Sequence, residues 1–374
     1  MKILLLTCNT GEGHNSASAA IQDVCAQRGI SCDTADALSF LSEKVSRVIS
    51  RWHVRIYRHM PKLFCSGYGF AENHPSIFNE RRLICRYLST GVNGLRAHLM
   101  KGQYDAVLCV HVFPALMMTE LIRRYPLNIQ TAFVSTDYTC SPITGDTDLN
   151  LYFVPHGDLL DEFESNGLPR DRLIPTGIPV RRAFCQPPEK AAARAELGLT
   201  QSRQIVLMCG SMGCGPMGLL SEEISAALPP DTGLNVICGT NAKLARTLTE
   251  KALPGVQVIH YTQKMAAWLA AADLFLTKPG GLSISEAATV GVPMLFLDTV
   301  GGCEARNLKF FTDHGWAQAA DSAKSMAEYC CGLIQDSSRL EERRTALRQT
   351  FCQNSASAIL DTLCARNEHF REDL

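Results

Sequence analysis

The sequence has no apolar run long enough to span a membrane. None of its 374 residues lies in a stretch of the roughly 18 to 20 uninterrupted apolar residues that a spanning helix needs. The first residues, MKILLLTCNTGEGH, become polar after a short apolar run and do not have the pattern of a secretory signal peptide. We therefore expect a cytoplasmic protein, whose contact with any membrane would be peripheral.

The chain also lacks an excess of one charge and a metal-type cysteine spacing. Lys and Arg number 36 against 37 Asp and Glu, and a net charge of −1 argues against a molecule built as a whole for nucleic acid. The sixteen cysteines include no C-x-x-C. Cys8, Cys109, Cys209 and Cys238 lie in or beside apolar runs, where cysteine behaves as a small core residue. We expect reduced structural thiols rather than disulfides or metal ligands.

Short apolar runs alternate with segments of helical length along the whole chain. Continuous apolar strands joined by helices are typical of parallel sheets covered on both faces. The expected strands are residues 2–8, 105–111, 130–136 and 149–155 in the first half, and 204–210, 234–239, 256–261, 274–278 and 293–298 in the second. The pattern predicts an α/β protein with two doubly wound, Rossmann-like halves and a cleft between them.

A change of composition marks the domain boundary. Residues 175–190, PTGIPVRRAFCQPPEK, contain four prolines and no apolar periodicity, and the helical pattern restarts at 189–197. We place one domain at 1–180 and a second at 181–345. The tail from about 338 to 369 predicts one or two helices.

The first glycine loop follows the first strand. Gly11-Glu12-Gly13-His14 is not a full G-x-G-x-x-G, because Ser16 stands at the third glycine position, and Glu12 would repel a phosphate. A dinucleotide site in this half is therefore disfavoured.

The second glycine cluster, residues 274–287, is better suited to a nucleotide. Gly280 and Gly281 make a turn into a helix, where the N–H groups of residues 281–283 could meet a diphosphate. Glu286, one turn into the helix, could accept hydrogen bonds from ribose hydroxyls. An ordinary strand-to-helix turn explains the same spacing, and both interpretations stay open.

A basic stripe lies between residues 44 and 62. Lys44, Arg47, Arg51, Arg55, Arg58 and Lys62 follow helical spacing without an intervening acid, and apolar residues including Trp52 fall on another face. Such a basic amphipathic helix suits an anionic membrane surface. The alternative is a helix packed on the core with a solvated basic face.

Several motifs together carry a family resemblance. They are GEGHNSA at 11–17, VSTDYT at 134–139, YFVP at 152–155, PTGIPV at 175–180, CGSMGCG at 209–215, TKPGGLSISEA at 277–287 and CEARN at 303–307. In this order and spacing the chain resembles the monogalactosyldiacylglycerol synthase and processive diacylglycerol glucosyltransferase family. That family is related to the peptidoglycan lipid II N-acetylglucosaminyltransferase.

The resemblance implies a GT-B fold with an N-terminal acceptor domain and a C-terminal nucleotide-sugar domain. It implies inverting transfer of a hexose from a UDP-sugar to diacylglycerol or a similar lipid, by an enzyme peripheral on the inner face of the cell membrane. Residues 346–374 would form a final helix that packs back on the N-terminal domain.

The resemblance also implies roles for individual residues. His14 would be the catalytic base, with Asp137 as its orienting group or as an alternative base. Arg47, Arg51, Trp52, Arg55, Arg58 and Lys62 would meet the membrane or the acceptor. The donor would be bound by Gly210, Ser211, Met212, Gly213, Tyr261, Gly280, Gly281, Ser283, Glu286 and Asn307.

One position departs from the family pattern. Cys303 stands where the family often has a glutamine that can touch sugar hydroxyls, and a thiol is a poor hydrogen-bond partner. The sequence therefore does not choose the donor sugar. We expect no obligatory metal or cofactor, because no acidic pair suggests a diphosphate-bound metal, and no nucleic-acid partner.

Two rival functions share the expected fold. A UDP-sugar 2-epimerase needs no membrane stripe and would interconvert UDP-sugars without lipid. An inactive membrane-associated UDP-sugar sensor would bind donor without transferring it. The lipid acceptor, the number of sugars added and the oligomeric state are not determined by the sequence.

Overall fold

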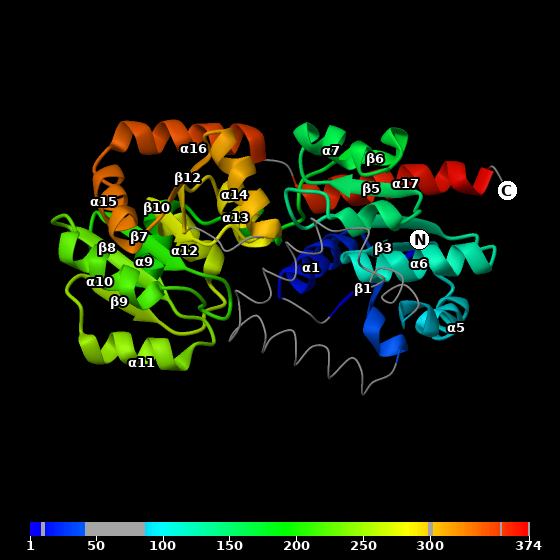
Figure 1. The fold of residues 1–374 in the computed structure, drawn as a ribbon, viewed down its shortest axis with the longest axis horizontal. Helices are drawn as coiled ribbons and strands as arrows, with labels where there is room; N and C mark the ends of the chain where they lie inside the picture. The colour runs from blue at the N-terminus through cyan, green and yellow to red at the C-terminus, as the bar shows by residue number, and fades with distance from the viewer. Residues whose placement is uncertain (9–11, 42–86, 298–301, 352–353, 373–374) are drawn as a thin grey trace, which may run out of the picture. The chain divides into compact units, whose positions relative to one another are not determined.

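The computed structural model describes residues 1–8, 12–41, 87–297, 302–351 and 354–372 (Figure 1). The chain forms two compact units, described separately below. Unit 1 comprises Met1–Arg181, Gly301–Cys303 and Asn354–Leu374, and unit 2 comprises Arg182–Val300 and Glu304–Gln353. Among the described helices, none combines the length and the apolar character that crossing a bilayer would require.

Unit 1 is built on a six-stranded parallel sheet with the order β2-β1-β3-β4-β5-β6. The strands are β1 Lys2–Thr7, β2 Ser31–Asp36, β3 Ala106–Cys109, β4 Gln130–Val134, β5 Leu151–Val154 and β6 Leu173–Pro175. The inner strands β3, β4 and β5 are buried at every residue, because helices cover both faces of the sheet.

Helices flank this sheet on both sides. They are α1 Glu12–Gln27, α5 Val92–Gly102, α6 Val112–Arg124, α7 Leu160–Ser165 and α17 Ser355–Glu372, with 3₁₀ turns at Ala37–Phe40, Ser89–Gly91, Pro142–Asp146, Gly157–Leu159 and Arg170–Arg172. Ile359, Leu360 and Leu363 of α17 pack with Ile21 of α1 in one core on the sheet. The last helix of the chain therefore completes the core that the first strand begins.

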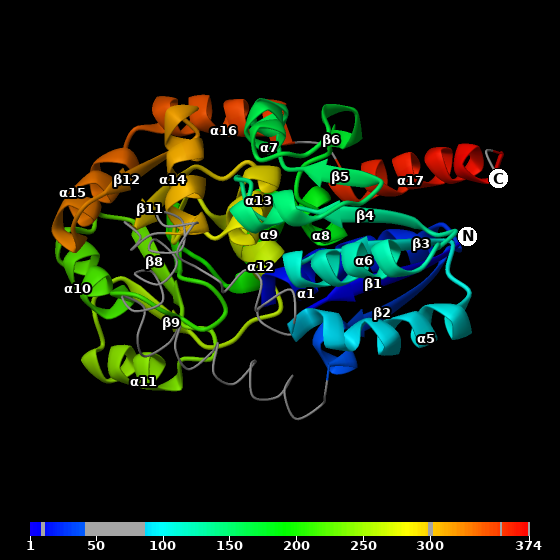
Figure 2. The same cartoon turned by 45° about the vertical axis from the view of Figure 1, so that its right-hand side comes forward.

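Unit 2 repeats the design with the order β12-β11-β10-β7-β8-β9. Its parallel strands are β7 Arg203–Met208, β8 Thr232–Ile237, β9 Val256–Ile259, β10 Leu274–Thr277, β11 Met294–Leu297 and β12 Ala317–Ala320. Within this unit α10 and α15 lie side by side, and α16 contacts α13 (Figures 1 and 2). The helices are α8 Arg182–Cys185, α9 Lys190–Leu197, α10 Met217–Ala227, α11 Ala242–Lys251, α12 Met265–Ala271, α13 Gly281–Val290, α14 Cys303–Asp313, α15 Ala323–Leu333 and α16 Ser337–Phe351.

The prediction of two Rossmann-like halves is confirmed, and all nine expected strands form. The sequence analysis missed β2, β6 and β12, which are all edge strands of their sheets. The tail forms two helices, α16 and α17, and residues 346–351, expected in the final helix, lie at the end of α16 in unit 2.

Candidate active site

His14 lies at the point where the strand order of unit 1 reverses. The chain leaves β1 toward β2 on one side, and β3 pairs with β1 on the other. In open parallel sheets, ligands bind at the carboxyl ends of the strands beside such a reversal. His14 stands in the first turn of α1, which follows β1, and its half-buried ring meets the backbone just beyond β3.

The contact with that backbone determines the tautomer of His14. Its Nδ1 is 2.9 Å from the carbonyl oxygen of Val110. A carbonyl oxygen only accepts, so Nδ1 carries the proton and donates it. In the neutral ring Nε2 is then the nitrogen that can take up a proton.

Two further side chains position the His14 ring. The hydroxyl oxygen of Thr136 lies 3.2 Å from Nδ1. The His111 ring packs edge to face against the His14 ring, with 4.7 Å between centroids and 82° between planes. His111 is itself held as the N-cap of α6, where its Nδ1 accepts a hydrogen bond from the N–H of Phe113 at 3.1 Å.

Asp137 is half-buried in the loop after β4, one residue beyond Thr136. Its backbone oxygen accepts a hydrogen bond from the Ser135 hydroxyl at 3.1 Å. The structure thus places Asp137 in the loop that reaches His14, and its chemical role stays a prediction.

In unit 2 the strand order reverses between β7 and β10, and both glycine loops follow these two strands. The first loop holds Gly210, Ser211, Met212 and Gly213. Gly210 and Gly213 have φ values of +71° and +56°, in the left-handed region that favours glycine.

The loop after β8 holds this first loop in place. A Cβ on Gly213 would lie 2.2 Å from the carbonyl oxygen of Cys238. The Thr240 N–H donates to Ser211 O at 2.9 Å, and Asn241 Nδ2 donates to Gly213 O at 2.9 Å. The two loops therefore form one closely packed edge.

The second loop leads into α13. Gly280 is the N-cap of this helix, and no side chain caps it. The first N–H groups of a helix have no partner within it, so this end of α13 is suited to an anion. Gly281 and Glu286 are buried in α13, and Ser283 is half-buried in its first turn.

Lys278 is a site residue that the sequence analysis missed. Its ammonium group pairs with Glu304 Oε1 at 2.6 Å, and both side chains are about three-quarters buried, with 22% and 27% of their surface exposed. A Cβ on Gly210 would lie 3.1 Å from Lys278 Cε, so the lysine stem connects the two glycine loops. Below it, burial raises the pKa of Cys209 to about 12, which keeps that thiol neutral.

Asn307 supports the second loop from behind. Its side chain is fully buried, and Nδ2 donates to the carbonyl oxygen of Pro279 at 3.0 Å. The structure therefore places Asn307 beneath the turn that begins α13.

Tyr261 lies farther along the same edge of the sheet. It follows β9, which β8 separates from β7, and 62% of its surface is exposed. The structure brings together the residues of the two glycine loops with Lys278, Glu304 and Asn307, and it places Tyr261 at the outer end of that row.

The basic stripe lies outside the described residues. Arg47, Arg51, Trp52, Arg55, Arg58 and Lys62 all fall within 42–86. Over the described ranges, no three His, Cys, Asp or Glu side chains are grouped as metal ligands would be. The expectation that no metal is needed stays a prediction.

Two residues that the sequence analysis did not assign to the site, Lys278 and His111, have informative positions in the sequence. Lys278 directly precedes Pro-Gly-Gly, where a cation beside an anion-binding turn is informative. His111 is the last residue of the predicted strand 105–111, at the carboxyl edge where the loop after the first strand must also lie. The contact of His14 with Val110 joins residues 96 positions apart, and only the folded chain reveals it.

Two family models match the chain. Residues 14–180 match the model described as "Monogalactosyldiacylglycerol (MGDG) synthase", and residues 204–349 match "Glycosyltransferase family 28 C-terminal domain". The chain is 28% identical over 381 residues to a processive diacylglycerol beta-glucosyltransferase of Staphylococcus saprophyticus, with 99% of this chain and 95% of the relative covered. The enzyme of the same name from Bacillus licheniformis is 26% identical over 377 residues, with 98% and 95% covered.

Solved structures share the fold. MurG of Acinetobacter baumannii has a TM-score of 0.63 at 14% identity, covering 97% of this chain and 99% of its own. The calicheamicin glycosyltransferase CalG4 has a TM-score of 0.65 at 13% identity, covering 98% and 99%. UDP-GlcNAc 2-epimerase of Neisseria meningitidis, in a crystal structure bound to UDP-GlcNAc, has a TM-score of 0.61 at 14% identity, covering 98% and 100%. The expected GT-B fold is thereby confirmed.

Proposed function

Because this chain belongs to the glycosyltransferases related to monogalactosyldiacylglycerol synthase, we propose that it moves a hexose from a UDP-sugar to diacylglycerol or a similar lipid. The transfer occurs at a membrane surface and inverts the configuration at the anomeric carbon. The relatives named as processive diacylglycerol beta-glucosyltransferases support the lipid acceptor. The solved epimerase of the same fold with UDP-GlcNAc bound supports a UDP-sugar donor.

The observation that carries this proposal is the hydrogen bond from His14 Nδ1 to Val110 O. It leaves Nε2 as the proton acceptor, which is the form a general base requires. The acceptor hydroxyl oxygen forms the new bond to the anomeric carbon while its proton passes to Nε2. The bond between the anomeric carbon and the phosphate oxygen breaks, and UDP leaves with the electron pair. One displacement of this kind inverts the anomeric centre.

The leaving diphosphate needs stabilisation that unit 2 is suited to supply. The uncapped N-terminus of α13 offers the N–H groups of Gly281, Leu282 and Ser283. The Lys278 ammonium group, paired with Glu304, lies beside this turn and can donate a charge-assisted hydrogen bond to a phosphate oxygen. Groups already aimed at developing charge stabilise a transition state without reorganising. This arrangement supports transfer without an obligatory metal.

The residues that bind the ribose and the uracil of the donor are assigned from their positions along the same edge of the sheet. Glu286 accepts hydrogen bonds from the ribose hydroxyls, and the backbone at Tyr261 meets uracil. Gly210, Ser211, Met212 and Gly213 approach the nucleotide closely because glycines there keep side chains out of the way. Asn307 acts by holding Pro279 in the turn.

Substitution of His14 tests the central claim. With diacylglycerol-containing liposomes and a panel of radiolabelled UDP-hexoses, the unmodified protein is expected to form labelled glycolipid. His14→Ala should abolish transfer and leave UDP binding intact, because the base acts only on the acceptor. Parallel measurement of Asp137→Asn separates the two candidate bases.

Other outcomes would contradict the proposal. Loss of UDP binding in His14→Ala would make this residue a donor ligand rather than the base. Interconversion of UDP-sugars without lipid would establish an epimerase. UDP binding without transfer to any offered lipid would point to a sensor.

A further inference from the structure

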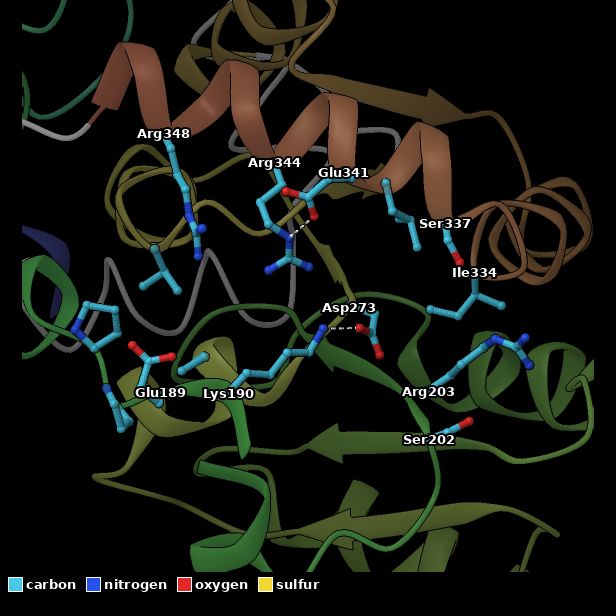
Figure 3. Close-up of a pocket in the computed structure, with 15 residues that line it drawn as sticks. Glu189, Lys190, Ser202, Arg203, Asp273, Ile334, Ser337, Glu341, Arg344 and Arg348 are labelled. Atoms are coloured by element: carbon cyan, nitrogen blue, oxygen red, sulfur yellow. Dashed lines mark hydrogen bonds and ion pairs between the residues drawn. The ribbon is translucent and has the colours of Figure 1, made fainter. Parts of the chain in front are cut away.

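Unit 2 contains a cavity of about 590 Å³ at the edge of the sheet opposite to the glycine loops (Figure 3). Its wall includes Arg203 at the start of β7 and Asp273 just before β10, so it lies at the amino ends of these strands. Its size falls within the range of small-molecule pockets. The cavity is therefore separate from the candidate donor site on the same sheet.

Positive side chains dominate one wall of this cavity. Arg344 and Arg348 extend from α16 toward the opposite wall, where Lys190 lies (Figure 3). The two arginines are one helical turn apart on the same face, a spacing at which like charges repel. Two cations facing one cavity suggest that an anion fits between them.

The lining acids offset most of this charge but leave one cation in excess, since Lys190, Arg203, Arg344 and Arg348 face Glu189, Asp273 and Glu341. Asp273 is the most buried of them, and both of its oxygens are occupied: one pairs with Lys190, and the other accepts from Arg194 Nη2 and from Gln204 N, each at 2.7 Å. Glu341 is 67% exposed and pairs with Arg344 Nε at 3.4 Å. The third acid of the wall, Glu189, is exposed at the N-cap of α9.

The two arginines differ in their surroundings. Only 11% of the Arg344 side chain is exposed, and burial lowers its pKa. The charges of Arg348 and Arg194 lower this pKa further, whereas those of Glu341 and Asp273 raise it. Within the described part of the chain, the Arg348 guanidinium forms no hydrogen bond or ion pair, and its stem packs on Gly291. Arg344 is largely buried and paired with Glu341, whereas Arg348 is exposed, and an anion held between the two guanidinium groups would offset the repulsion between them.

We propose that this cavity binds a phosphate-bearing anion between the guanidinium groups of Arg344 and Arg348. Guanidinium groups match phosphate oxygens with paired hydrogen bonds, and Lys190 on the opposite wall is held by its ion pair with Asp273. The apolar part of the lining, which includes Pro187, Val290 and Leu340, accommodates an organic group attached to the phosphate. The phosphate belongs either to a free metabolite or to a lipid headgroup.

The test uses the full-length protein with UDP at saturation, so that the donor site is occupied. Inorganic phosphate is titrated at constant ionic strength, and binding is followed by the rise in melting temperature. Arg344→Gln and Arg348→Gln are expected to weaken phosphate binding by about tenfold or more, as the loss of a charged hydrogen-bond partner does. Arg339→Gln is the matched control, because Arg339 is exposed on the same helix α16 and does not line the cavity.

A second arm identifies the source of the phosphate. Vesicles of phosphatidylcholine with phosphatidylglycerol are compared with vesicles of phosphatidylcholine alone. Binding that requires phosphatidylglycerol and is weakened in Arg348→Gln supports a lipid headgroup, whereas a response to inorganic phosphate alone supports a free metabolite.

Stability without phosphate separates binding from a structural role. Arg348→Gln relieves repulsion with Arg344, so its melting temperature should equal or exceed that of the unmodified protein. A lower value would mean that Arg348 stabilises α13 through Gly291, and the proposal would be wrong. It would also be wrong if Arg348→Gln bound phosphate as tightly as the unmodified protein, or if neither phosphate nor vesicles bound.

Discussion

Lys278 and Glu304 form a largely buried ion pair beside the turn that begins α13. The lysine stem lies against Gly210, and a Cβ on Gly280, the N-cap of α13, would lie 3.9 Å from both Lys278 Cε and Glu304 Oε1. Removing only one partner would leave an uncompensated charge in a partly buried place. The pair must therefore be tested by single and double substitution.

We predict that Lys278→Met lowers kcat for sugar transfer by about 10²-fold, as loss of one preorganised charge-stabilising group does. Steady-state kinetics with UDP-sugar measures this. If kcat recovered fully in the double variant Lys278→Met/Glu304→Gln, the loss in Lys278→Met would have come only from the unpaired charge left on Glu304. Lys251→Met is the control, since that lysine pairs with Glu222 on the surface of unit 2. An unchanged kcat in Lys278→Met would contradict the assignment.

The loop between β7 and α10 contains three glycines with left-handed backbone. Gly210, Gly213 and Gly215 all have positive φ, but their surroundings differ. A Cβ at Gly213 would collide with the Cys238 carbonyl oxygen, whereas at Gly215 nothing lies within 4 Å. The two positions thus separate backbone strain from steric overlap.

We expect Gly215→Ala to lower the free energy of unfolding by about 1 kcal/mol, from the left-handed backbone alone. Gly213→Ala should cost about 3 kcal/mol or more, because the loops at 209–215 and 238–241 must also move apart. Denaturant unfolding measures the free energy of unfolding of both variants. UDP affinity reports whether the loops at 209–215 and 238–241 have moved apart. Equal costs at the two positions would show that the contact with Cys238 does not constrain the loop.

At the scale of the whole molecule, the chain does not follow a simple order of one unit after the other. Its last helix, α17, belongs to unit 1, although α14, α15 and α16 before it belong to unit 2 except for Cys303. Leu360 of α17 is fully buried with Ile3 and Leu5 of β1 in one core. The stability of unit 1 therefore depends on residues at the far end of the sequence.

We predict that Leu360→Ala destabilises unit 1 by about 2–5 kcal/mol, the range for a buried leucine. Hydrogen exchange should become faster in peptides from β1 and β3, with peptides from β7 and β8 unchanged. Leu340→Ala, in the core of unit 2, is the reciprocal control. Faster exchange in both units for Leu360→Ala would mean that they do not unfold separately.

The strands that the sequence predicted and those that it missed differ in burial. The inner strands β1, β3, β7 and β10 each contain a continuous apolar run, because helices cover both faces of each sheet. The missed strands have an open edge: β2 reads SCDTAD, β6 has three residues and ends in Pro175, and β12 reads AQAA. The edge strand β9, VQVI, was predicted because it keeps apolar residues, so the missed strands escaped detection through their polar or short sequences and not through the open edge alone.

The sequence by itself determined the class of fold, the positions of the glycine turns and the histidine after the first strand. These are local properties, set by apolar periodicity and by the few residues that tolerate a sharp turn. Only the tertiary structure decided that Val110 selects the tautomer of His14, that Lys278 joins the two glycine loops, and that Arg344 and Arg348 face one cavity. Those relations depend on which strands become neighbours in a sheet. That choice is made by the packing of residues far apart in the chain.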